Sequence, residues 1–310
     1  VYASLPEARL RSIISKNASP ESLRGTLRSA VPIFRNFKEW SRHFGTPTPE
    51  DVFDFCVHHP LLPTLLKKMA DMKGTRCILP KPVAVTEKNW DAINRVCKRN
   101  ELQCAVASQW YYSRLTQALA TAYKKLSEKA LVRRITMNFS QEFTIAQLIH
   151  HSPTSGFLPH MLQILSSMGI PMTALGGCTT RKKNLHYEMT YTKPIPISLV
   201  TDMGPARNNP QKIRAVRVFT KENTPVIESD FYAHFEKGKV VAYPSLTVFG
   251  KRTEIRENNL RTMMKKILGA FEEKATPFAR NPEALSLERY WPIARELIAI
   301  QSHTDLNHFP

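Results

Sequence analysis

Glycine is scarce in this sequence. The 310 residues contain 11 glycines, whereas an average usage of about 7% would give about 22. No two glycines stand in the arrangement G-x-G-x-x-G, the turn that lays a dinucleotide pyrophosphate on a helix N-terminus. The sequence therefore contains no phosphate-binding turn of this type.

Long apolar runs and cysteine motifs are also absent. No apolar run approaches the eighteen or so residues of a membrane span, and the first residues lack the order of a secretory signal. We therefore expect no membrane span. The five cysteines form no C-x-x-C pair and no Cys/His ligand spacing, which predicts neither a metal site nor a disulfide framework. Cys56, Cys77 and Cys104 lie in apolar runs and are expected to be buried.

Acidic residues are outnumbered by basic ones. There are 44 Lys and Arg against 26 Asp and Glu, which gives a net charge of +18 and a pI near 9.8. Such a chain is attracted to polyanions such as RNA or to an anionic membrane surface. The alternative is an ordinary solvated basic surface, because no run of five or six like charges marks a dedicated nucleic-acid arm.

The pattern of apolar residues predicts an α/β protein with two domains. Residues 1–108 alternate short strand-like runs with helical stretches, as in a parallel Rossmann-like sheet. The expected strands are residues 1–4, 31–34, 52–57, 76–79 and 102–108, and the expected helices are 6–16, 62–72 and 87–100. Thr86 is placed as the N-cap of the third helix.

Residues 109–310 predict a C-terminal α+β domain with an open, mostly antiparallel sheet. Long strands are expected at 131–139, 185–192, 195–203, 213–220, 226–234 and 239–249. Helices are expected at 111–127, around Phe157 and Met161, at 258–273 and at 286–301.

One local pattern points to a known family. Gly74 is followed by a strand and then by Pro80, Lys81 and Pro82. This segment resembles the glycine, strand and Glu-Lys-Pro motif of the Gfo/Idh/MocA oxidoreductases (glucose-fructose oxidoreductase, inositol dehydrogenase and rhizopine catabolism). Downstream, residues 155–161 resemble the start of the helix that carries the family's Asp-x-x-x-His motif. Upstream, residues 1–9 resemble its second strand and the helix that follows.

The resemblance implies particular roles for particular residues. Lys81 and His160 match the catalytic lysine and histidine, which act on the hydroxyl that is oxidised. His59 and Pro60 take the place of the family's Thr-Pro and, with Lys81 and Pro82, would contact the cofactor. A solvated lysine and a core histidine are the ordinary alternatives.

Several departures from the family's pattern oppose activity. The chain opens at what matches the second strand, so we expect a truncated domain without the first strand and its glycine-rich turn. Pro80 replaces the glutamate of Glu-Lys-Pro, and Gly156 stands where the aspartate before the histidine is expected, which removes carboxylates that would orient the site. His59 replaces the threonine. The high charge and low glycine content are also unlike a soluble dehydrogenase.

Other candidates are less specific. An aromatic and basic group could contact a sugar or a base, since rings and a guanidinium suit either: Trp110, Tyr111, Tyr112 and Arg114. Core packing is the more common role of such residues. The adjacent His150 and His151 point in different directions and have no third ligand, so no metal site is expected there. Basic clusters at 133–134, 181–183 and 265–266 are solvated faces or phosphate contacts.

Two functions follow from these patterns. In the first, a degenerate and inactive oxidoreductase homologue serves as a structural or binding subunit of a basic, RNA-containing assembly such as a mitochondrial ribosome, with no cofactor. In the second, the sequence is a fragment of an NAD- or NADP-dependent oxidoreductase that acts on a sugar or polyol. The first predicts a mitochondrial location and the second allows a cytoplasmic one.

Overall fold

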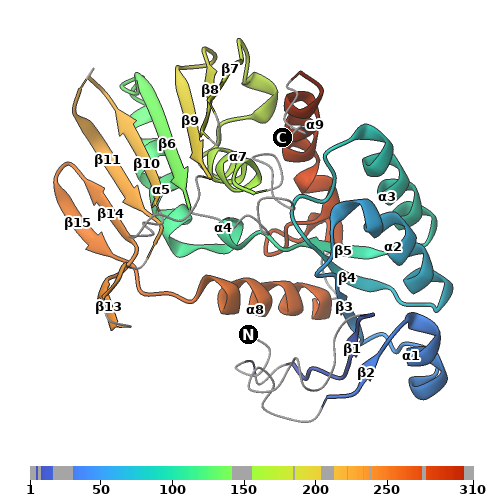
Figure 1. Ribbon diagram of the computed structural model, residues 1–310. Helices are drawn as coiled ribbons and strands as arrows, with labels where there is room; N and C mark the ends of the chain where they lie inside the picture. Colours follow the sequence, from blue (N-terminus) through green and yellow to red (C-terminus); the bar gives the residue numbers. More distant parts are fainter. Residues whose placement is uncertain are drawn as a thin grey trace. The chain divides into compact units, whose positions relative to one another are not determined.

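The computed structural model describes residues 5, 8–16, 31–141, 156–183, 186–203, 213–221, 223–232, 234–236, 239–273 and 277–303 (Figure 1). The chain forms two compact units. Unit 1 comprises Val1–Gln109 and Asn258–Trp291, and unit 2 comprises Trp110–Glu257 and Pro292–Pro310. The sequence-based division, in contrast, assigned everything after residue 108 to the second domain. No helix in the described ranges is long and apolar enough to cross a membrane.

The centre of unit 1 is a parallel sheet of three strands in the order β3-β4-β5. The strands and the helices between them are β3 (Val52–Asp54), α2 (Leu62–Asp71), β4 (Arg76–Leu79), α3 (Glu87–Arg99) and β5 (Gln103–Val106). Thr86 caps α3 as predicted, because its side chain accepts a hydrogen bond from the Asn89 N–H at 3.3 Å. Helices α2 and α3 pack against each other.

A second, two-stranded parallel sheet precedes this one. Strand β1 (Ile13–Ile14) pairs with β2 (Ile33–Phe34), which is followed by α1 (Phe37–Phe44). The predicted helix over residues 6–16 is therefore wrong where the structure describes it. The β-branched pair at 13 and 14 favours a strand, and β2 supplies its backbone partners. The predicted strand at residues 1–4 lies outside the described residues.

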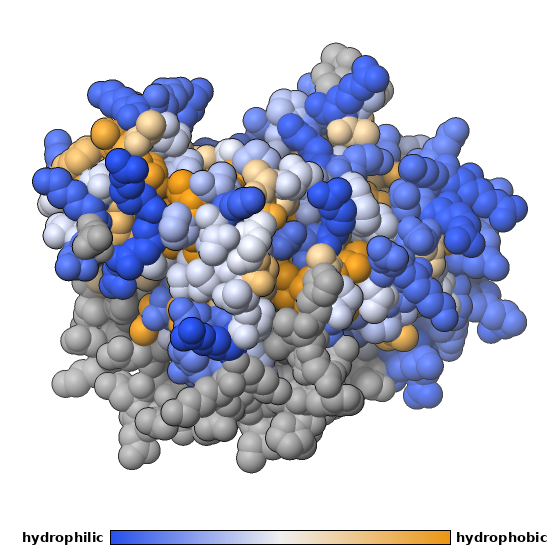
Figure 2. Space-filling model, turned by 90° about the horizontal axis from the view of Figure 1, so that it is seen from above, coloured by the Kyte–Doolittle hydropathy of each residue, from blue (hydrophilic) through white to orange (hydrophobic). Residues whose placement is uncertain are grey.

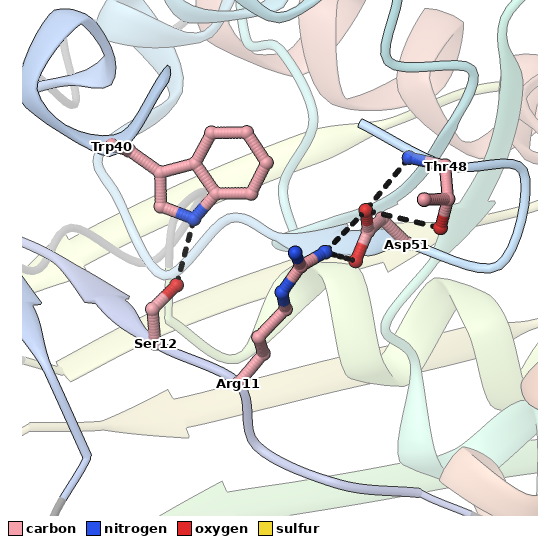
Figure 3. A network of polar contacts seen from close by, with 5 residues as sticks. All are labelled: Arg11, Ser12, Trp40, Thr48 and Asp51. Atoms are coloured by element: carbon pink, nitrogen blue, oxygen red, sulfur yellow. Dashed lines mark hydrogen bonds and ion pairs between the residues drawn. The ribbon is translucent and has the colours of Figure 1, made fainter. Parts of the chain in front are cut away.

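Side chains connect the two parallel sheets (Figure 3). Arg11, just before β1, donates to both carboxylate oxygens of Asp51, just before β3, at 2.8 Å each. Asp51 also accepts from the N–H and hydroxyl of Thr48. The Trp40 indole of α1 donates to the Ser12 hydroxyl at 2.8 Å. Among the described residues, no backbone hydrogen bond joins β1 to β3.

The segment from α8 (Asn259–Glu272) to the start of α9 (Leu287–His303) completes unit 1. The Leu285 carbonyl accepts from the Val106 N–H at 2.8 Å, so this segment extends the free edge of β5. Trp291 stacks on Trp90 of α3 with ring centroids 4.7 Å apart. These contacts explain why residues far along the chain belong to the first unit.

Three cysteines meet in the core of unit 1. The Cys104 sulfur lies 3.3 Å from the sulfurs of both Cys77 and Cys97. Sulfur hydrogen bonding and burial raise the pKa of Cys97 and Cys104, so these thiols stay protonated. Burial is confirmed for Cys77 and Cys104. It is wrong for Cys56, which is exposed because β3 ends before it.

Unit 2 contains an eight-stranded sheet in the order β15-β14-β11-β10-β6-β9-β8-β7. Only the pair β6 and β9 is parallel, which confirms the predicted open, mostly antiparallel sheet. The strands are β6 (Arg134–Ser140), β7 (Thr179–Lys183), β8 (His186–Tyr191), β9 (Ile197–Asp202), β10 (Ile213–Phe219), β11 (Pro225–Asp230), β14 (Ser245–Val248) and β15 (Lys251–Glu254). A separate hairpin joins β12 (His234–Glu236) to β13 (Lys239–Ala242).

Helices cover one face of this sheet. Helix α5 (Arg114–Ser127) contacts β11 and β14, and α7 (Leu158–Ser167) contacts α5 and β9. On β6, Ile135, Met137 and Phe139 are fully buried while the residues between them are partly exposed, as expected for a sheet with one covered face.

Two predicted elements are divided in the structure. The expected helix at 111–127 is split by the N-cap Ser113 into α4 (Gln109–Tyr112) and α5. The expected strand at 239–249 is split into β13 and β14 around Pro244, which has no N–H to donate to a ladder.

We predict that Asp51→Asn destabilises unit 1 at neutral pH. Partial burial alone would raise the pKa of Asp51, but Arg11 and the Thr48 hydrogen bonds hold it below its ordinary value of 3.8. This stabilisation is therefore present above pH 3.8 and is lost as the pH falls through the lower folded pKa. Because Arg11 is 40% exposed, the expected loss is only about 1 kcal/mol.

The measurement is urea unfolding at pH 7 and at pH 3. The difference between wild type and Asp51→Asn is expected at pH 7 and should shrink at pH 3. Glu50→Gln makes the same charge change at the neighbouring exposed position. An equal effect of both substitutions would contradict a specific role for the ion pair.

Candidate functional site

The predicted cofactor-binding residues of unit 1 lie at one edge of its parallel sheet. His59 and Pro60 follow β3, and Lys81 and Pro82 follow β4 after Pro80. Strands β3 and β4 are parallel neighbours, so their carboxyl ends point to the same edge, where open α/β sheets bind ligands. The Lys81-Pro82 peptide bond is cis.

The backbone at this edge is poor in donors. Pro60 stands at the start of the 3-10 helix η2 (His59–Leu61), and Pro80 and Pro82 flank Lys81. Proline has no N–H group, whereas pyrophosphate is normally held by a series of backbone N–H groups. Pro60 and Pro82 match the prolines of the family's Thr-Pro and Glu-Lys-Pro motifs, so Pro80 is the proline at this edge that departs from the pattern.

Burial removes the charge of His59 at this edge, and at the opposite end of β4 a glycine permits close packing of α2. Burial, with a smaller contribution from His58, lowers the pKa of His59 to about 4, so its ring is neutral at pH 7 and offers no charge to a phosphate. At Gly74 an added Cβ would lie 2.7 Å from the Met69 side chain of α2. This glycine permits close contact between α2 and the start of β4.

Unit 2 brings two of the predicted site residues together. The ring of His160, in the first turn of α7, meets the Trp110 ring edge-on with centroids 5.9 Å apart. Trp110 packs in the same way against Phe231 at 5.0 Å. Trp110 is 3% exposed, and in the described part of the chain its indole N–H has no hydrogen-bond partner. Its ring therefore packs against the rings of both His160 and Phe231.

The other predicted substrate-binding residues do not gather at this point. Tyr112 is 1% exposed and belongs to the core, where it packs edge-on against Tyr111. Arg114 is exposed in the first turn of α5. The N-terminus of α5 already holds the Glu257 carboxylate, which accepts from the Ser113 hydroxyl at 2.7 Å and the Arg114 N–H at 2.9 Å. An anionic ligand would have to displace it.

A residue that sequence reasoning missed is Arg214 of β10. It is only 6% exposed. Its guanidinium donates to the carbonyl oxygens of Ser140 and Ile213 and to the Gln141 side chain at 2.8 to 2.9 Å. Among the described residues it has no carboxylate partner. Burial lowers the pKa of Arg214 to about 10, which leaves it charged at pH 7.

Aromatic rings surround the guanidinium group of Arg214. The guanidinium carbon lies 4.3 Å from the ring centroid of Phe157, the N-cap residue of α7, and 5.2 and 5.5 Å from those of Phe139 and Tyr232. Cation-π contacts of this kind are worth up to about 2 kcal/mol each when desolvated. Arg214 therefore joins β6, β10 and the start of the helix that carries His160.

A signal for Arg214 was present in the sequence. In the strand at 213–220, Arg214, Val216 and Val218 alternate and so share one face. Because valines at this spacing indicate the buried face, the arginine in register with them is predicted to be buried too.

His150 and His151, like the other residues of 142–155, lie outside the described residues. Within the described ranges, no group of three or more His, Cys, Asp or Glu is placed to hold a metal ion. Lys81 belongs to unit 1 and His160 to unit 2, so their assignment as a catalytic pair stays a prediction.

Comparison with known proteins supports the fold. No protein-family model matches the sequence, and no curated protein sequence is significantly similar to it. Among solved structures, an oxidoreductase from Agrobacterium radiobacter in complex with NAD+, L-tartaric acid and magnesium has a TM-score of 0.65 at 11% identity, covering 99% of this chain and 92% of its own.

Two further structures agree. A dehydrogenase from Chromobacterium violaceum has a TM-score of 0.65 at 12% identity, covering 98% of this chain and 90% of its own. The aldose-aldose oxidoreductase from Caulobacter crescentus has a TM-score of 0.62 at 12% identity, covering 97% and 91%. All three neighbours are named as oxidoreductases or dehydrogenases, and this confirms the predicted resemblance at the level of fold.

We predict that Arg214→Ala destabilises unit 2 by about 3 kcal/mol, because three hydrogen bonds to a charged group and the packing among aromatic rings are lost together. Arg217→Ala is the matched control on the same strand, since Arg217 is half exposed and makes only a 3.5 Å ion pair with Glu228. That change should cost less than about 1 kcal/mol. Urea unfolding measures both, and equal losses would contradict the assignment of Arg214 as a buried anchor.

Proposed function

We propose that this protein is a non-catalytic relative of these oxidoreductases and serves as a structural or binding subunit of a basic, RNA-containing assembly, such as a mitochondrial ribosome. One observation carries the proposal. The fold is that of oxidoreductases, but this sequence lacks the two carboxylates of the resembling family's catalytic motifs.

The state of the other site residues supports the same interpretation. Pro80 and Gly156 stand where the resembling family has carboxylates, so Lys81 and His160 lose the groups that would orient them. His59 is buried and neutral. Trp110 packs against the His160 ring. Each of these positions retains a place in the fold.

The charge of the chain supports an anionic partner. A net charge of +18 favours association with a polyphosphate through release of counterions, and RNA offers many more phosphates to neutralise than a dinucleotide does. A mitochondrial location is part of this proposal, because ribonucleoprotein assemblies of that compartment need basic protein subunits.

A second function is supported by a specific observation. The similar structure from Agrobacterium radiobacter contains NAD+, and His59 and Lys81 lie at the ligand-binding edge of the sheet. As an NAD- or NADP-dependent oxidoreductase of a sugar or polyol, the protein would use Lys81 to hold the substrate oxygen and His160 to take its proton. A cytoplasmic location would suit this function. A glycine-rich strand, turn and helix encoded upstream of Val1 would favour it.

The first test is the effect of pyridine nucleotides on thermal stability. A ligand that binds only the folded state raises Tm, and at one hundred times its Kd it adds about 2.7 kcal/mol. We predict no change in Tm with NAD+, NADH, NADP+ or NADPH at millimolar concentration. A rise in Tm that Lys81→Ala abolishes and Lys88→Ala retains would favour the oxidoreductase, since Lys88 is an exposed lysine of α3.

The second test is RNA binding as a function of salt. We predict that the protein binds single-stranded RNA and that log K falls linearly with log salt concentration, with a slope of about −0.7 per phosphate neutralised. Fluorescence anisotropy with a labelled RNA measures this. Absence of binding at low salt would contradict the first function, and a slope near zero would exclude charge as its cause.

A further inference from the structure

We propose that one end of the eight-stranded sheet, called the basic sheet end, is the surface of unit 2 that binds single-stranded RNA. It consists of Lys129, Arg133, Lys193, Lys221, Phe249 and Lys251. The proposal rests on the RNA-binding function above and gives it a location. It is derived from the strand register, the exposure of these side chains and an unusual backbone conformation.

The register places these residues at the same end of the sheet. Arg133 precedes β6, and its N–H donates to the Phe219 carbonyl at the end of β10. Lys221 follows in the turn between β10 and β11. Lys251 begins β15 and pairs with Val248, the last residue of β14. Lys129 lies in the loop after α5 that leads into β6.

Lys193 extends the basic sheet end, as a row of cations, to the other side of β6. It follows β8, whose last residue Tyr191 pairs with Ile197, the first residue of β9. Since β6 and β9 are parallel, the start of β9 lies beside the start of β6. Neighbouring strands are about 4.8 Å apart, so the row from β15 to β9 spans roughly 24 Å, enough for several nucleotides.

The cations of this row are exposed and are not neutralised by nearby acids. All five are exposed, and within the described ranges none has a carboxylate at ion-pair distance. The neighbouring Glu128 and Glu254 lie near other cations, Lys124 at 3.8 Å and Arg252 at 3.8 Å. The row therefore presents uncompensated positive charge, which complements a chain of phosphates.

Phe249 adds an exposed aromatic ring to this charge. It is 68% exposed, the largest exposure among the large hydrophobic residues described. It forms with Gly250 the two-residue turn between β14 and β15, with φ angles of 48° and 79°. Two positive φ angles are typical of a type I′ hairpin turn, in which Asn-Gly is preferred. A phenylalanine in the left-handed region costs about 1 kcal/mol.

Neither folding nor stability explains a phenylalanine at this position. Its ring contacts no aromatic residue among those described, and a smaller residue would suit the backbone better. An exposed ring beside phosphate-binding cations is the arrangement on which unpaired bases stack. Figure 2 shows hydrophobic groups directly beside strongly hydrophilic ones on the side of the view that carries the large sheet. Stacking favours single-stranded RNA over a duplex, whose bases are not available.

Another basic cluster predicted from the sequence lacks this combination. Lys266 of α8 is paired with Glu283 at 2.9 Å, so the cluster at 265–266 is partly neutralised. Helices α2 and α3 carry exposed lysines without an exposed aromatic ring beside them, which makes them suitable controls.

The first experiment compares two variants with equal charge. Arg133→Gln, Lys221→Gln and Lys251→Gln are combined in one protein, and Lys67→Gln, Lys88→Gln and Lys98→Gln of α2 and α3 in the other. Binding of a fluorescein-labelled single-stranded RNA of about 12 nucleotides is measured by anisotropy at several salt concentrations. The first variant should bind at least ten-fold more weakly than the control and reduce the salt slope by about 2.

The second experiment separates binding from stability. Phe249→Asn introduces the Asn-Gly pair that this turn type prefers, so it should raise Tm by about 2 °C. It also removes the ring, so it should weaken binding of the same RNA about ten-fold. Phe249→Trp should retain binding. A variant that is more stable and yet binds RNA less tightly cannot owe its loss of affinity to unfolding.

The outcomes distinguish the proposed surface from the proposed function. If the wild-type protein does not bind the RNA, both are overturned. If it binds, and both charge variants bind equally or Phe249→Asn binds as well as wild type, the basic sheet end is wrong while RNA binding stands. A duplex RNA of the same length that binds as tightly as the single strand would overturn the stacking role of Phe249.

Discussion

What unit 1 can bind depends on the side chains and backbone groups that the fold gathers at the carboxyl edge of its parallel sheet. Strands β3 and β4 are aligned as neighbours, so whatever follows them must share one edge. The prolines there cannot donate hydrogen bonds, and His59 is held neutral by burial. A fold that in a similar structure accompanies NAD+ is thus combined, at His59 and Pro80, with residues that differ from the family's pattern. Positive charge is found instead on other surfaces of the molecule.

Much of the fold could be predicted from sequence because the pattern and the packing agree. The N-cap Thr86 predicts the start of α3, and apolar runs or apolar alternation predict the strands β4, β6 and β10. In each case the packing of the folded chain favours the same element as the local sequence. The prediction failed at β1, because two isoleucines form a strand only when a distant partner such as β2 is present. It also failed at Pro244, where a missing N–H divides an apolar run in two.

The candidate site was predictable only in part. Lys81 and His160 were found through a resemblance in order and spacing. The contact between the rings of Trp110 and His160 became evident only from the structure. Arg214 was missed because a charged residue in a strand is usually interpreted as exposed, although its register with Val216 and Val218 places it inside. The environment of His59 could not be predicted from sequence, since its pKa depends on burial by residues distant along the chain.

Unit 1 is built from two separate stretches of chain, Val1–Gln109 and Asn258–Trp291, with most of unit 2 between them. During synthesis the ribosome makes β5 long before Leu285 and Ser286 exist to pair with its outer edge. Until then the nascent strand presents unpaired backbone groups, the kind of edge on which chains aggregate. The first unit to begin folding is thus among the last to be finished, and a chaperone that shields this edge would raise the yield of the protein.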